Sequence, residues 1–171
     1  MKMNPKVAEA LNTQINNELN ASYAYLSMAA YFDSIGLAGF ASWFRGHSAE
    51  ETEHGMRIYD YLVRRDVRVE LKGIDTPPAD FGTPAEAIAA ALAMEETVTG
   101  QIHALFQLAH EEKEFPTLTM LNWFLEEQIE EEDLFRGVVE RVAAAEGNRW
   151  HLLTLDRELG QGGGEESEEE A

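Results

Sequence analysis

The sequence has no cysteine, no long apolar run and few basic residues. Without cysteine there are no disulfide bonds or thiolate ligands, so any metal must be held by oxygen atoms or imidazoles. A membrane span needs about 18 consecutive apolar residues, and export needs an apolar N-terminal segment with a basic flank; neither pattern occurs. The sequence therefore predicts a cytoplasmic protein without a membrane span.

Basic residues are outnumbered, since 13 Lys and Arg stand against 32 Asp and Glu for a net charge of −19. Nucleic-acid binding needs clustered basic residues, so no nucleic-acid partner is expected. The balance favours attraction of cations. Part of the charge lies at the end of the sequence, where Glu-rich residues follow Gly162-Gly163-Gly164. We expect one domain over residues 1–160 and a disordered acidic tail over 161–171, because the tail has no apolar area to bury.

The rest of the sequence is typical of helices. Proline and glycine breaks, with apolar residues at alternating spacings of four and three, predict long helices over about 5–33, 37–66, 83–112 and 114–147. A short fifth helix is expected over 148–159, ended by Gly160. The segment from Val67 to Thr83 is long enough to travel the length of a bundle. The fold class is therefore all-α: an antiparallel four-helix bundle with one long crossover and a short fifth C-terminal helix.

Polar residues interrupt the four apolar seams halfway along each long helix. In each half of the sequence an acid is followed by two polar residues, 33 and 36 positions later. The second set of three lies 77 residues after the first. Because these positions share one depth in the bundle, their side chains are expected to meet in one layer of the core. They are Glu18, Glu51 and His54 in the first half, and Glu95, Gln128 and Glu131 in the second.

Such a layer indicates a pair of metal ions. Several buried carboxylates in contact cannot all be ionised unless cations lie between them. Oxygen donors with one imidazole suit iron or manganese, whereas zinc would bind without redox chemistry. Glu51 is expected to bridge two ions. Glu18 and His54 would complete the shell of one ion, and Glu95 and Glu131 that of the other.

Other residues near the layer are expected to support it. Gln128 is a poor metal ligand and is expected to position water or a ligand carboxylate. Tyr25 lies one heptad beyond Glu18 and could donate a hydrogen bond or an electron, or serve only in core packing. His47 is interpreted as a supporting residue and not a ligand. The structural alternative for the whole layer is a buried polar network that fixes helix register.

With Glu50 and Glu127 beside the seams, this pattern resembles the bacterial non-haem ferritins over about residues 5–160. The resemblance implies a ferroxidase centre that oxidises Fe(II) with dioxygen or hydrogen peroxide. It also implies a homo-oligomeric shell of twenty-four subunits that stores the ferric product as a mineral. The third iron site of bacterial members maps to Glu50, Glu127, Glu130 and Glu131. Bacterioferritins carry a haem-ligating Met directly after the bridging Glu; this chain has Thr52 there, so no haem is expected.

Two other functions remain open on the sequence alone. One is a di-iron oxidase or peroxidase of the rubrerythrin type, which consumes oxidant without storing metal. The other is a structural or metal-buffering bundle without turnover. The second polar pair, Gln128 and Glu131, lacks the histidine of two-histidine relatives and so favours ferritin. The apolar fifth helix, too short to extend the bundle, also favours a storage shell.

Overall fold

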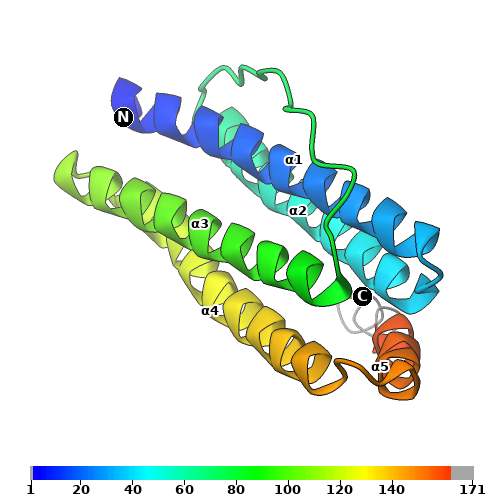
Figure 1. Ribbon diagram of the computed structural model, residues 1–171. Coiled ribbons are helices and arrows are strands. Elements are labelled where there is room, and N and C mark those ends of the chain that lie inside the picture. Colours follow the sequence, from blue (N-terminus) through cyan, green and yellow to red (C-terminus); the bar gives the residue numbers. More distant parts are fainter. Residues whose placement is uncertain (1, 163–171) are drawn as a thin grey trace.

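The computed structural model describes residues 2–162 of the chain, which form five helices and no strand (Figure 1). The predicted all-α bundle with a short fifth helix is confirmed. Of the predicted tail, residues 163–171 lie outside the described residues. Over the described range, none of the helices combines the length and apolarity needed to cross a membrane. The helices are α1 (Pro5–Ser34), α2 (Ala38–Arg64), α3 (Pro84–Glu111), α4 (Phe115–Ala144) and α5 (Arg149–Gly162).

Local sequence signals explain where the helices begin. The Asn4 side chain accepts a hydrogen bond from the Lys6 N–H, and proline occupies the first position of α1. Thr83 and Glu86 form a reciprocal capping box at the start of α3. Both devices satisfy N–H groups that have no partner inside the helix.

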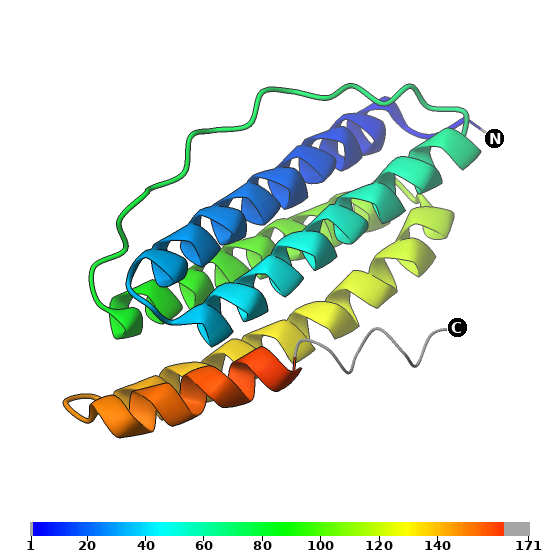
Figure 2. The same cartoon turned by 90° about the vertical axis from the view of Figure 1, so that its right-hand side faces the viewer.

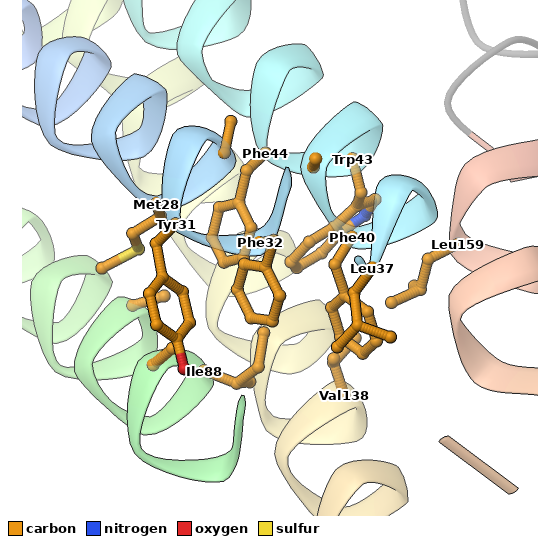
Figure 3. Packing of buried hydrophobic residues seen from close by; sticks show 14 of the residues in the cluster. Met28, Tyr31, Phe32, Leu37, Phe40, Trp43, Phe44, Ile88, Val138 and Leu159 are labelled. Atoms are coloured by element: carbon orange, nitrogen blue, oxygen red, sulfur yellow. The ribbon is translucent and has the colours of Figure 1, made fainter. Parts of the chain in front are cut away.

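Two apolar clusters lie on either side of the polar layer. In the first, Phe32 stacks on Phe40 and Phe44 with ring centroids 4.8 and 5.4 Å apart (Figure 3). The second includes Leu11 and Phe124 and fills the other end of the bundle. Because the layer residues fall between these clusters along every long helix, the polar layer is closed off from water at both ends.

The long crossover of residues 65–83 runs alongside α1 as an extended segment (Figure 2). It has no secondary structure, so its backbone must find partners elsewhere. Three asparagines, each four residues apart on one face of α1, supply them. Asn12, Asn16 and Asn20 accept hydrogen bonds from the backbone N–H groups of Glu70, Lys72 and Asp75 at 2.8, 3.2 and 2.9 Å.

Helix α5 crosses the start of α2 at a very close approach. A Cβ atom on Gly39 would lie 1.7 Å from the carbonyl oxygen of Asp156, and one on Gly160 would lie 2.9 Å from the Gly39 Cα. The Asp156 carboxylate accepts the Phe40 N–H at 2.9 Å, which caps α2 from another helix. The prediction that Gly160 ends the fifth helix is wrong: α5 continues to Gly162, and Gly160 serves the crossing.

This crossing predicts opposite effects of the same substitution at two glycines of α2. Gly46→Ala should raise the unfolding temperature, because no atom lies within 4 Å of the added methyl and Ala is favoured in helices by about 1 kcal/mol. Gly39→Ala should lower it, because α5 must move away. Thermal unfolding followed by circular dichroism measures both. Equal stabilisation by the two variants would show that the close approach does not constrain α5.

Candidate metal centre

The six residues predicted for the polar layer all have buried side chains, and they come from four helices. Helix α1 supplies one acid, α2 an acid and an imidazole, α3 one acid, and α4 an amide and an acid. Each residue lies near the middle of its helix, between apolar residues on the same face. The helical repeat therefore places all six at the same level along the bundle. They are Glu18, Glu51, His54, Glu95, Gln128 and Glu131.

The side chains of Glu18, Glu51 and His54 form a first group able to hold a cation. One ligand atom from each lies within 4.8 Å of the others. The Oε2 atoms of Glu18 and Glu51 are buried and have no hydrogen-bond partner among residues 2–162. Buried carboxylate oxygens without a partner are costly. A divalent cation between them would satisfy both, so this donor set fits a metal ion.

A second group contains His47, Glu50 and Glu131, again with one ligand atom each within 4.8 Å of the others. The His47 Nδ1 atom lies 2.9 Å from Glu50 Oε2 and 3.6 Å from Glu131 Oε2. The Glu131 Oε2 atom is also buried without a hydrogen-bond partner in the described part of the chain. Sequence reasoning gave His47 a supporting role, whereas the geometry allows it to be a ligand. Its position on the apolar seam, one turn before Glu51, was the available signal.

Glu95 lies in the same layer but is already hydrogen bonded. The Tyr25 hydroxyl donates to its Oε1 atom, and the Gln128 amide donates to its Oε2 atom at 3.2 Å. The same amide is 3.2 Å from the Thr99 hydroxyl. Tyr25 and Gln128 therefore fix the orientation of the Glu95 carboxylate, which would face a second ion.

The amide of Gln14 was missed by the sequence analysis. Gln14 is buried and its Nε2 donates to Glu18 Oε1 at 2.9 Å. It lies four residues before Glu18, on the same face of α1. This spacing could have identified it. The amide holds one oxygen of Glu18 and leaves the other for a cation.

Burial shifts the pKa values of three acids of the layer, Glu18, Glu51 and Glu131, upward. Burial, reinforced by the charge of Glu51, raises the pKa of Glu18 well above its usual range. Burial and the charge of Glu95 raise the pKa of Glu51 to about 8 and that of Glu131 to about 9. The same two causes raise the pKa of Tyr25. At neutral pH Glu51 and Glu131 therefore hold protons that an arriving cation must displace.

One side of the layer opens into a cavity of about 680 Å³ between α2 and α4, here called the acidic vestibule. Glu50, Glu127 and Glu130, predicted for a third iron site, line it together with Glu131. Two further acids, Glu53 and Asp133, were not predicted, since exposed acids on a helix flank carry no distinguishing pattern. The complete lining is His47, Glu50, Glu53, His54, Arg57, Trp123, Glu127, Glu130, Glu131, Asp133 and Leu134.

Two acids of the vestibule, Glu50 and Glu127, have pKa values shifted in opposite directions. A hydrogen bond from the neighbouring His47 side chain lowers the pKa of Glu50. Partial burial raises the pKa of Glu127. Glu50 is therefore charged at neutral pH and gives the second group, of which it is a member, a negative charge that attracts cations.

Comparison with known proteins decides the family, because the model of the ferritin-like domain matches residues 8–145. The chain belongs to the ferritin family. Bacterial non-heme ferritin of Staphylococcus aureus is 35% identical over 158 residues, covering 92% of this chain and 95% of that protein. The Staphylococcus haemolyticus protein of the same name is 42% identical over 127 residues, 74% of this chain and 76% of that one.

Solved ferritin structures share the fold. The open pore ferritin of Archaeoglobus fulgidus superposes with a TM-score of 0.92 at 41% identity, covering 93% of this chain and 98% of that one. An engineered closed form of the same archaeal ferritin gives the same score and identity. The resemblance to ferritins inferred from the polar layer is thereby confirmed.

The raised pKa values predict how the stability of the metal-free ferritin depends on pH. Glu51 and Glu131 have folded pKa values of about 8 and 9 against an ordinary 4.5. Between the ordinary pKa of 4.5 and these folded values, the folded chain therefore binds more protons than the unfolded chain. The contribution of Glu51 and Glu131 to the free energy of unfolding consequently falls as pH rises. The unfolding temperature should drop between about pH 6 and pH 8.5, and less so in Glu51→Gln/Glu131→Gln.

The matched control for this prediction is Glu96→Gln/Glu126→Gln, because both residues are exposed on α3 and α4, two of the helices that carry layer acids. It should keep the pH dependence of the unaltered chain. The same slope in all three proteins would mean that the buried carboxyls do not hold the protons assigned to them.

Proposed function

We propose that this ferritin is an iron-storage ferroxidase. The observation that carries the proposal is the set of three buried carboxylate oxygens without a partner within residues 2–162, two in the first cation-binding group and one in the second. Two Fe(II) ions bind there as substrate, each loses one electron, and the ferric ions leave for storage. The two electrons with two protons convert dioxygen to hydrogen peroxide, or hydrogen peroxide to two waters.

The residues divide into two half-sites. Glu18 and His54 hold one iron, Glu95 and Glu131 hold the other, and Glu51 bridges them. Carboxylate oxygens stabilise Fe(III) more than Fe(II) because they are hard, charged donors, so this ligand set favours loss of the electron. Protons displaced from Glu51 and Glu131 on iron binding are available to the reduced oxidant.

The acidic vestibule gives the irons a route toward a third site. Glu50, Glu127 and Glu130 line it, and Glu131 belongs to both the layer and the vestibule. A ferric ion displaced from the second half-site therefore meets further carboxylates before it meets bulk water. This continuity supports a third iron site at these four residues.

Storage requires an assembly, which we propose to be a homo-oligomeric shell of twenty-four subunits. Ferritin family membership and the similar ferritin structures support this. Helix α5 supports it as well, because Trp150 at its start is 76% exposed in the single chain. The cytoplasmic location and the absence of haem stay predictions from the sequence.

Iron loading tests the site. Fe(II) added aerobically to metal-free protein should be oxidised at least ten-fold more slowly by Glu18→Ala/His54→Ala than by the unaltered chain, because one half-site loses two ligands. Glu9→Ala/His103→Ala removes the same residue types from exposed positions of α1 and α3 and should leave the rate unchanged. Absorbance of the ferric product gives the rate. Equal rates in both double variants would refute the site.

Iron retention separates storage from its alternative. A ferritin should retain far more iron per subunit than three sites can hold, in a particle many times heavier than the 19.2 kDa chain. A rubrerythrin-type oxidase would oxidise iron equally fast but release it and remain a small oligomer. Mass in solution and iron content after gel filtration distinguish the two.

A further inference from the structure

A basic groove lies beside the acidic vestibule. It has a volume of about 860 Å³ and is formed by the last three turns of α2 and the first turns of α4. Three of the 13 Lys and Arg side chains of this acidic protein line it, against the single carboxylate of Asp60. The lining residues are Arg57, Asp60, Tyr61, Val63, Arg64, Arg65, Pro116, Thr119, Met120 and Trp123.

The three arginines are held differently. Arg65 donates to the Tyr61 hydroxyl at 2.6 Å and to Glu114 at 3.1 Å, so its charge is matched. The Arg57 guanidinium stacks over the Trp123 ring at 3.9 Å, which fixes its plane and leaves its N–H groups free. Within residues 2–162, neither Arg57 nor Arg64 makes an ion pair or a side-chain hydrogen bond.

Eight of the 13 Lys and Arg side chains make no ion pair within residues 2–162, and Arg57 and Arg64 are the two of these that line the same groove. Arginine stays charged at any physiological pH, and its fork of N–H donors matches the oxygens of phosphate or carboxylate. The groove lies between the carboxyl-terminal end of α2 and the amino-terminal end of α4, whose dipoles oppose each other, so its positive charge comes from the arginine side chains. These features together are those of a site for an oxyanion.

The groove and the acidic vestibule share a wall, because Arg57 and Trp123 line both cavities. Trp123 also contacts His54 edge-on, with ring centroids 5.2 Å apart. A cation leaving the polar layer through the vestibule therefore passes next to Arg57. A ferric ion is a hard cation and takes hard oxygen donors.

We propose that this groove binds inorganic phosphate and presents it to ferric ions that leave the vestibule. Arg57 and Arg64 bind the phosphate oxygens through their free N–H groups, and Trp123 keeps Arg57 in place. Binding itself does not depend on the proposed function; only the delivery of phosphate to stored iron rests on it.

Phosphate binding to the metal-free, full-length protein tests the site without iron chemistry. Equilibrium dialysis with labelled phosphate should show a binding site whose affinity falls at least ten-fold in Arg57→Gln/Arg64→Gln. The matched control Arg68→Gln/Arg149→Gln removes two exposed arginines elsewhere and should bind as the unaltered chain does. Equal binding by the two double variants would overturn the assignment, as would no binding by the unaltered chain at millimolar phosphate.

The single variant Arg64→Gln separates phosphate binding in the groove from iron oxidation in the polar layer. It should weaken phosphate binding yet leave the initial rate of Fe(II) oxidation unchanged, because Arg64 lines the groove and not the vestibule. Mineral formed by that variant with phosphate present should contain less phosphorus per iron.

Discussion

The structure depends on the burial of like charges in one layer. Carboxylates from all four long helices are taken out of water at the same depth, and two apolar clusters exclude solvent on either side. Without a cation Glu51 and Glu131 keep their protons at neutral pH, and three carboxylate oxygens of the layer find no partner within the described residues. Helix α1 packs mainly on α2 and α3 mainly on α4, and the polar layer lies where these two helix pairs meet.

Much of this arrangement could be predicted from the sequence because helix geometry is periodic. The spacing of 33 and 36 residues placed Glu18, Glu51 and His54 at one depth, and the Thr83-Pro84 pair marked the start of α3. Periodicity gives the depth of a residue along the bundle but not the direction in which its side chain finally turns. For that reason the ligand geometry of His47 was not foreseen. Gly160 was misread, since a glycine that permits a close crossing has the same sequence signature as one that ends a helix.

The polar layer has two chemically different sides. Toward α2 and α4 it meets the carboxylates of the vestibule, whereas toward α1 and α3 it meets neutral amides. There Gln14 donates to Glu18 and lies 3.3 Å from the Gln101 oxygen, and Asn17 donates to Gln14 at 3.2 Å. Amides hold a carboxylate in place without adding charge that would attract cations. The electrostatic potential is therefore more negative on the vestibule side of the layer, and this side attracts cations more strongly.

Over residues 70–75 the asparagines of α1 hold the crossover by its backbone, whereas Val67 and Val69 pack their side chains against the second apolar cluster. Leu71 and Ile74 point outward and are 62% and 46% exposed in the single chain. The side chains of residues 70–75 therefore contribute little to the path that the crossover follows. A foreign peptide could replace residues 70–75 and be displayed along the outside of α1. Its path would be set by the three asparagines of α1 and not by its own side chains.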